Sequence, residues 1–310
     1  MSSERVAAIV GPTASGKTAV AIELAKIIPA EIISADSMAV YRGMDIGTAK
    51  PTAEERRQAV FHAIDIVDPI EGFSAGQFEQ LARETIIDIS ARGKLPLLAG
   101  GTGLYVRAAL DGLDTRAAAP NQEIRNRLSA IAAEAGGEGL LKKLSEVDSE
   151  TAAKLNPKDI KRIIRALEIF EVTGRPASEI YRKTRRGSNF PNAVIFGLTM
   201  NRQELYARIE SRIDAQMRSG LLKEVETLLT KVSPECVAMQ GLGYKELARH
   251  LMGEISLDEA VYLFKRNTRR FAKRQLTWFR ADSRIKWIDT GNSSAAEVAV
   301  EIYNSWDKVS

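Results

Sequence analysis

The chain has 310 residues, of which 45% are hydrophobic and 27% charged, and its formal net charge is +4. This composition is typical of a globular protein with a sizeable core and excludes a disordered, collagen-like or low-complexity chain. The apolar runs are too short for a membrane span, and the first residues show no apolar core of a signal peptide. The single cysteine, Cys236, excludes an internal disulfide and a cysteine-rich metal site. We therefore expect a soluble, cytoplasmic protein.

Strand and helix patterns alternate through the first hundred residues. Short apolar runs predict buried strands at 6–10, 31–34 and 95–99. Apolar residues at helical spacing follow the first run, from Val20 to Ile28, and precede the third, from Phe78 to Ile89. This alternation is typical of a parallel sheet with helices on both faces, so we predict an α/β fold.

The character of the chain changes after about residue 114. Residues 115–192 are polar and helical in period, which predicts a helical insertion. Further strands are predicted at 63–67, 193–200 and 284–288, with helices between 203 and 267. We therefore expect a core domain formed by 1–114 and 193–310, interrupted by a helical domain at 115–192.

The strongest local signal is a glycine-rich motif between the first strand and the first helix. It matches G-x-x-x-x-G-K-[ST] with Gly11, Pro12, Thr13, Ala14, Ser15, Gly16, Lys17 and Thr18. Such a loop turns backbone N–H groups and a helix N-terminus towards phosphate oxygens. Lys17 supplies a positive charge and the Thr18 hydroxyl can bind Mg²⁺. The sequence therefore predicts a phosphate site, although a plain glycine-rich turn is the alternative.

Two further turns follow strands that end at the same edge of the predicted sheet. Asp36 and Ser37 follow the second strand, and a second glycine-rich turn containing Thr102 follows the third. Ligands of such sheets lie across the carboxyl ends of the strands. Asp36 is thus a candidate general base or Mg²⁺ ligand through water, with helix capping as the alternative. The Thr102 turn can hold a second part of the ligand or can simply begin a helix.

Basic residues concentrate at two places. Four recur at helical spacing opposite an apolar stripe: Lys158, Lys161, Arg162 and Arg165. Seven more lie between residues 260 and 281, where no acidic residue occurs: Lys265, Arg266, Arg269, Arg270, Lys273, Arg274 and Arg280. Aromatic residues line the other side of this second helix, and we expect them in the core. The basic faces favour a phosphate-rich partner such as RNA over ordinary solubilising charge.

With these motifs in place, the sequence resembles the tRNA dimethylallyltransferases, which prenylate adenosine 37 next to the anticodon. The resemblance covers nearly the whole chain. It rests on the Gly11–Thr18 loop and on the segments 36–51, 99–105, 161–168, 240–246 and 268–279. It implies a P-loop NTPase-like parallel sheet with a mainly helical insertion that binds tRNA.

The resemblance also implies a reaction and its residues. The loop 11–18 would hold the diphosphate of dimethylallyl diphosphate, with Mg²⁺ on Thr18 and an arginine from the 204–217 helix, for which Arg212 is preferred over Arg208. Asp36 would take the proton of the adenine amine, Thr102 would contact the substrates, and Lys17 would stabilise the charge of the leaving group.

Contacts to tRNA carry over in the same way. They fall on Asp36, Ser37, Met38, Ala39, Arg125, Lys161, Arg162, Ile163, Ile164, Arg165, Gly241, Leu242, Gly243, Tyr244 and Lys245. Many relatives carry Gln where this chain has Ala39, so a side-chain hydrogen bond is missing there. The zinc finger of eukaryotic relatives is absent. We expect a monomer.

Two other functions share parts of this pattern. A P-loop small-molecule kinase also combines such a loop with an aspartate on the second strand. An RNA-binding NTP switch without enzymatic activity would have no need of Asp36 or Thr102. Phosphoryl transfer to a metabolite without prenylation of tRNA would favour the kinase.

Overall fold

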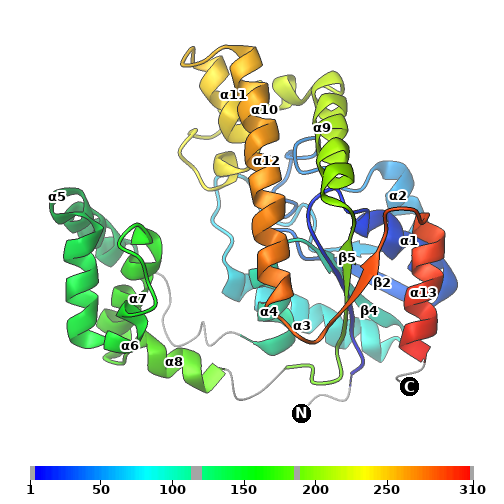
Figure 1. Cartoon of the computed structure of the whole chain (residues 1–310), viewed down its shortest axis with the longest axis horizontal. Helices are drawn as coiled ribbons and strands as arrows, with labels where there is room; N and C mark the ends of the chain where they lie inside the picture. Colours follow the sequence, from blue (N-terminus) through cyan, green and yellow to red (C-terminus); the bar gives the residue numbers. More distant parts are fainter. Residues whose placement is uncertain (1–3, 113–120, 185–188, 308–310) are drawn as a thin grey trace. The chain divides into compact units, whose positions relative to one another are not determined.

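The computed structural model of the chain describes residues 4–112, 121–184 and 189–307 (Figure 1). It divides into two units. The larger comprises residues 1–109 and 192–310, and the smaller comprises residues 110–191. No helix among the described residues is both long and apolar enough to cross a membrane.

The larger unit is built on a six-stranded parallel sheet with the strand order β3-β2-β4-β1-β5-β6. Its strands are β1 (Ala7–Val10), β2 (Ala30–Ser34), β3 (Phe61–His62), β4 (Leu95–Gly100), β5 (Val194–Thr199) and β6 (Ile285–Asp289). In the register, Ala7 of β1 pairs with Leu97 and with Val194. β1 is buried along its whole length, which explains its uninterrupted apolar sequence. The predicted α/β fold is confirmed.

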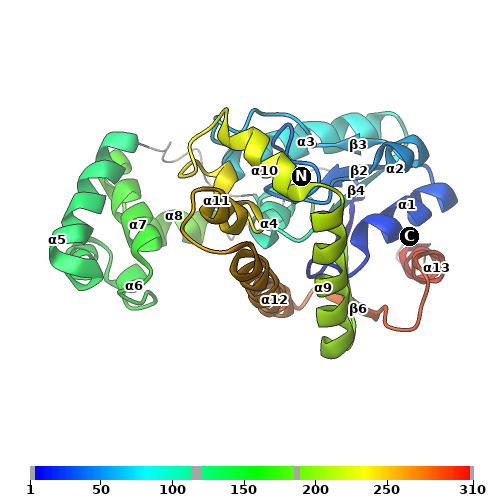
Figure 2. The same cartoon turned by 90° about the horizontal axis from the view of Figure 1, so that it is seen from above.

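Helices cover both faces of this sheet (Figure 2). On one face, α1 (Lys17–Ile27) and α13 (Ala295–Asp307) pack together, and Leu24, Ile302 and Trp306 join Phe196 of β5 in one core. On the other face lies α3 (Ala75–Ala91), which contacts β2 and β4. Two shorter helices complete this part, α2 (Ala53–Gln58) and α4 (Gly103–Asp111).

A second group of helices follows β5. It consists of α9 (Arg202–Arg218), α10 (Leu221–Leu229), the 3₁₀ helix η2 (Ala238–Gln240), α11 (Tyr244–Leu251) and α12 (Leu257–Arg280). Two ion pairs join α12 to α9, at 2.6 Å between Lys265 and Asp214 and at 2.5 Å between Arg269 and Glu210. The acid-free segment predicted from the sequence therefore receives its acidic partners from another helix.

The smaller unit contains α5 (Gln122–Val147), α6 (Ser149–Ala152), α7 (Ile160–Thr173) and α8 (Ala177–Thr184). α5 is interrupted at Gly136, whose φ is 67°. Leu128 and Leu144 of α5 pack against Ile163 and Leu167 of α7, so the unit has a core of its own.

Two expectations from the sequence are wrong. The strand expected at 63–67 is only Phe61–His62, because Ala63 and Asp65 adopt positive φ values of 61° and 57° that end the strand. The aromatic side of α12 is only partly core: Phe264 is 3% exposed but Trp278 is 40% exposed.

Candidate functional site

The glycine-rich loop joins β1 to α1 at the carboxyl edge of the sheet. Gly16 precedes the first residue of α1 with a φ of 88°, and Ala14 also has a positive φ, of 65°. The Lys17 ammonium donates a hydrogen bond to the carbonyl oxygen of Pro12 at 2.6 Å. Thr13, Ala14, Lys17 and Thr18 line a cavity of about 410 Å³. The loop is therefore folded as a phosphate site would require, with its lysine beside a cavity.

Asp36 and Thr102 reach the same cavity because β2 and β4 end close together. A Cβ on Gly100 would lie 2.1 Å from the Ala35 carbonyl oxygen, so only glycine permits this approach. The Thr102 amide then donates to Ala35 O at 3.1 Å, and the Thr102 hydroxyl accepts from the Ser37 amide at 3.0 Å. Both Asp36 and Thr102 line the cavity with Lys17. The structure thus brings the three residues predicted as catalytic to one place.

Lys17 and Arg212 are two of the cationic side chains that line the cavity. Arg212 of α9 lines the cavity, whereas Arg208 is exposed and does not. Burial and the neighbouring Arg212 charge lower the pKa of Lys17 to about 7, against a smaller opposing effect of Asp36. Burial also lowers the pKa of Arg212, again opposed by Asp36. A site that holds two cations so close together is suited to a multiply charged anion.

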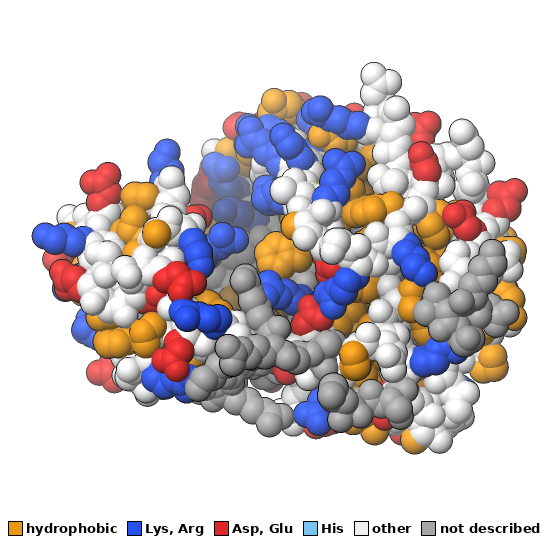
Figure 3. Space-filling model, turned by 60° about the horizontal axis from the view of Figure 1, so that its bottom comes forward, with side chains coloured by type: hydrophobic (Ala, Val, Ile, Leu, Met, Phe, Trp, Pro, Cys, Tyr) orange, Lys and Arg blue, Asp and Glu red, His pale blue; other side chains and the backbone are white. Residues whose placement is uncertain are grey.

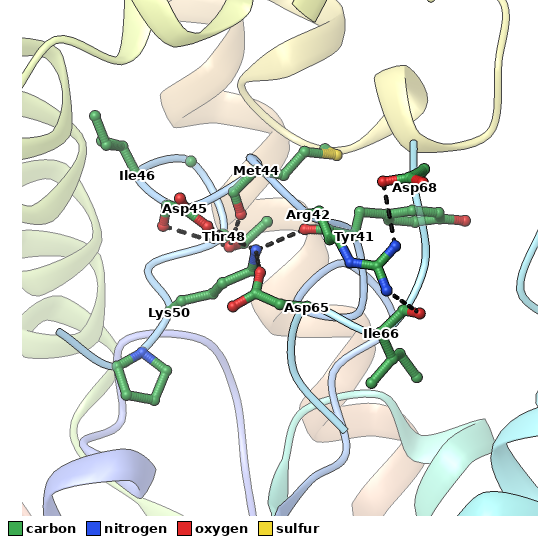
Figure 4. Close-up of polar contacts among 12 residues, drawn as sticks. Tyr41, Arg42, Met44, Asp45, Ile46, Thr48, Lys50, Asp65, Ile66 and Asp68 are labelled. Carbon is green, nitrogen blue, oxygen red and sulfur yellow. Dashed lines mark hydrogen bonds and ion pairs between the residues drawn. The ribbon is translucent and has the colours of Figure 1, made fainter. Parts of the chain in front are cut away.

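The loop between β2 and α2 is held in shape by a buried lysine (Figure 4). The Lys50 ammonium donates to Tyr41 O at 2.6 Å and pairs with Asp45 at 2.7 Å and Asp65 at 2.5 Å. Burial raises the pKa of Asp65, but hydrogen bonds from Lys50 and Arg56 outweigh it and hold that pKa below its usual range. Lys50 itself lines the cavity, as do residues 36–39 and 47–51 of this loop, so the network holds one wall of the cavity in place.

Comparison with known proteins assigns the family. A family model described as IPP transferase matches residues 39–282, and one described as isopentenyl transferase matches residues 4–61. The chain belongs to the IPP transferase family. The resemblance inferred from the sequence motifs is thereby confirmed.

Individual relatives agree with this assignment. The tRNA dimethylallyltransferase of Desulforudis audaxviator is 52% identical, over 91% of this chain and 90% of the relative. The tRNA dimethylallyltransferase of Carboxydothermus hydrogenoformans is 47% identical, over 97% of this chain and 96% of the relative. The solved tRNA isopentenylpyrophosphate transferase of Bacillus halodurans has a TM-score of 0.75 at 43% identity and covers 99% of this chain and 96% of its own. A eukaryotic dimethylallyltransferase, solved acting on tRNA, has a TM-score of 0.85 at 27% identity. The match covers 99% of this chain and 80% of the eukaryotic chain.

Tyr244 of this IPP transferase supports the 45–47 loop. Its hydroxyl donates to Glu224 at 2.6 Å, and Glu224 also accepts from three backbone amides, those of Asp45, Ile46 and Gly47. The Tyr244 side chain is 0% exposed, and burial followed by the Glu224 charge raises its pKa. Of the predicted tRNA contacts at 241–245, only Lys245 is exposed, while Gly241, Leu242 and Tyr244 line the cavity.

The predicted tRNA contacts on the smaller unit divide into three kinds. Ile163 and Ile164 are buried in its core, so their side chains face away from any RNA. Arg125 and Arg165 both pair with the fully buried Glu168, at 2.8 Å and 2.6 Å. Lys161 and Arg162 are exposed. Of these side chains, only those of Lys161 and Arg162 are therefore both exposed and without an ion pair among the described residues.

Sequence reasoning missed the contribution of α12 to the cavity of the transferase. Phe264, Thr268, Phe271 and Gln275 all line it, together with Arg274. Their spacing of three and four residues places the first four on one side of the helix, which is a signal that the basic doublets obscured. Four basic residues of α12, Arg274 among them, are exposed and form no ion pair within the described residues: Arg270, Lys273, Arg274 and Arg280. Figure 3 shows Lys and Arg side chains gathered on one face of the larger unit.

The donor set at the loop fits a magnesium ion only together with a ligand. No group of three His, Cys, Asp or Glu side chains able to hold a metal occurs among residues 4–112, 121–184 and 189–307. Thr18 lines the cavity beside Lys17, and Asp36 lies on the same cavity. Mg²⁺ keeps several waters and is commonly bound by one protein oxygen together with substrate phosphates. The residues present fit that mode of binding.

Proposed function

We propose that this transferase moves a dimethylallyl group from dimethylallyl diphosphate to the exocyclic N6 of adenosine 37 in tRNA and releases diphosphate. The observation that carries the proposal is the shared cavity, in which Asp36 and Thr102 face a phosphate loop flanked by Lys17 and Arg212. An NTP switch without enzymatic activity needs the loop but no carboxylate base beside it. A P-loop kinase can share both features, so the choice between kinase and transferase depends on the family relatives. The relatives named above are transferases that act on tRNA, which supports the same conclusion.

In this reaction the C1–O bond of the allyl diphosphate breaks as a bond forms between C1 and N6. The adenine amine is a poor nucleophile because its lone pair is delocalised, so removal of its proton matters. Asp36 takes that proton, and Thr102 contacts the reacting groups. Lys17, Arg212 and the amides of the loop stabilise the charge that develops on the diphosphate. Thr18 would hold Mg²⁺ with the diphosphate oxygens, where the ion neutralises the leaving group.

The nucleic acid partner is the anticodon stem-loop of tRNA. Adenosine 37 must leave its stack to enter the cavity, as in other enzymes that modify a base. The exposed Lys161 and Arg162 of α7 and the basic residues of α12 supply phosphate contacts. We propose that the protein acts as a monomer in the cytoplasm.

Mass spectrometry of nucleosides tests the proposal. Unmodified tRNA is incubated with the enzyme, dimethylallyl diphosphate and Mg²⁺, digested, and analysed for N6-dimethylallyladenosine. Replacement of adenosine 37 by guanosine is the control and abolishes the product. Product absent from wild-type reactions, or phosphoryl transfer from ATP to a metabolite in its place, would contradict the assignment.

A further inference from the structure

The side-chain amide of Gln275 joins the two turns that carry the reaction. The Thr13 amide of the phosphate loop donates to Gln275 Oε1 at 2.8 Å, and Gln275 Nε2 donates to the Gly101 carbonyl oxygen at 2.9 Å. The Gln275 side chain comes from α12, is 7% exposed and lines the cavity.

Only a side-chain amide of this length can accept the hydrogen bond from the Thr13 turn and donate one to the Gly101 turn. A backbone N–H such as that of Thr13 can only donate and a carbonyl such as that of Gly101 can only accept, so the orientation of the amide is fixed. A glutamate at this position would place an oxygen against the Gly101 carbonyl. A Cβ on Gly101 would lie 2.3 Å from Gln275 Nε2, so glycine is needed for the contact.

From Gly101 the connection continues to the proposed base. Thr102 follows in the chain, its amide donates to Ala35 O at 3.1 Å, and its hydroxyl accepts from the Ser37 amide at 3.0 Å. Asp36 lies between Ala35 and Ser37. A path of hydrogen bonds and one peptide link, between Gly101 and Thr102, therefore runs from the loop that holds the leaving group, through Gln275, to the residues on both sides of Asp36.

We propose that Gln275 is a positioning residue that sets the distance between the phosphate loop and the Asp36–Thr102 pair. It acts through Thr13 and Gly101 rather than by touching the reacting atoms. Reacting atoms must lie about 3–3.5 Å apart, and a displacement of about 1 Å can cost about 100-fold in rate. The inference rests on the proposed function, because it assigns the diphosphate to one turn and the base to the other.

The test compares Gln275→Met, which keeps the volume but forms neither bond, with Gln275→Glu. Gln203→Met and Gln203→Glu on the exposed start of α9 are the matched controls. Single-turnover transfer to tRNA, the Kd of dimethylallyl diphosphate and the unfolding midpoint are measured for each. We expect a loss of about 10–100-fold in the single-turnover rate of both Gln275 variants, a Kd within about 3-fold of wild type, and unchanged controls.

Two results overturn the inference. One is a Gln275→Met enzyme with a wild-type single-turnover rate. The other is a rate that falls only in proportion to a weaker Kd, since Gln275 would then act as part of the diphosphate site. The wild-type enzyme is assayed first: a failure to prenylate tRNA rejects the proposed function itself, whereas an active wild type with a fully active variant rejects only the positioning role.

Discussion

Arg212 and Lys17 lie close enough for the Arg212 charge to add to burial in lowering the pKa of the Lys17 ammonium to about 7. The two side chains come from α9 and from the start of α1, and both line the cavity. At neutral pH the unliganded site therefore holds Lys17 partly in its neutral form. An anion bound between the two side chains offsets their repulsion and favours the charged form.

Binding of the diphosphate should therefore take up a proton. The pKa of Lys17 rises when the anion binds, so affinity is highest below pH 7 and falls as the pH increases through 7. At pH 8 about 0.9 proton is expected to be taken up per site, because a group with a pKa near 7 is then mostly neutral. Calorimetric titration in two buffers of different ionisation enthalpy measures this number. Lys17→Met should show none of it, and an equal uptake by that variant would assign the proton elsewhere.

Asp36→Asn separates the base from the capping role that the sequence left open. Asp36 Oδ1 accepts a hydrogen bond from the Met38 amide at 2.8 Å, and an asparagine oxygen can keep that bond. We expect single-turnover prenylation to fall by about 10²–10⁴-fold, the usual effect of losing a general base. The affinity for tRNA should change little. Asp36→Ala should lose the rate as well. An asparagine variant that retains its rate would leave Asp36 as a turn residue.

The parts of the site that the sequence predicts are those carried by short local patterns. The phosphate loop is one continuous motif, and Asp36 and Thr102 each follow a strand by a few residues. Because parallel strands end at a common edge, the sequence alone predicts that Asp36 and Thr102 converge. The family motif additionally selected Arg212 over Arg208, and only Arg212 lines the cavity.

What the sequence could not predict depends on contacts between distant segments. Gln275 reaches turns that lie 262 and 174 residues away, and Glu224 caps a loop more than 170 residues before it. Nor does a motif say which of its side chains point inward. Ile163 and Tyr244 belong to segments predicted to touch tRNA, yet both are fully buried. Ile163 packs in the core of the smaller unit, and Tyr244 lies against the cavity and bonds to Glu224.

Arg212→Met should weaken the binding of dimethylallyl diphosphate by about 10-fold or more, since a charge-assisted contact is worth about 1.5–3 kcal/mol. It should also raise the pKa of Lys17, because one cause of its lowering is removed. Arg208→Met is the matched control on the same helix and should leave both quantities unchanged, since Arg208 is exposed outside the cavity. Fluorescence or calorimetric titration measures the affinities. Equal losses in the two variants would remove Arg212 from the diphosphate site.

Tyr244→Phe tests whether Tyr244 supports the loop or contacts tRNA. Its hydroxyl donates to Glu224 Oε1, which also accepts from the Gly47 amide, while Oε2 accepts from the amides of Asp45 and Ile46, so the variant removes one of the two donors to Oε1. We expect the free energy of unfolding to fall by about 1–3 kcal/mol. The Kd for tRNA should stay within about 2-fold of wild type when measured well below the unfolding midpoint. A large loss of tRNA affinity without loss of stability would indicate that Tyr244 contacts tRNA and does not merely support the loop.

Arg162 on α7 tests the basic side of the smaller unit. Its side chain is exposed, and next to it Ile163 is buried in the core, so Arg162→Ala removes a charge without disturbing the packing. If Arg162 contacts a phosphate, the variant releases about one counterion fewer on binding. The slope of log K against log salt should then become shallower by roughly 0.7–0.9.

Filter binding or fluorescence anisotropy over a series of salt concentrations gives that slope. Lys143→Ala on α5 is the matched control, because Lys143 is also exposed but lies outside the predicted contacts. The rate of prenylation at saturating tRNA should be unaffected, since α7 belongs to the smaller unit and the cavity to the larger one. An unchanged slope would mean that the charges on α7 only keep the surface hydrated, and RNA binding would then depend on the exposed basic residues of α12.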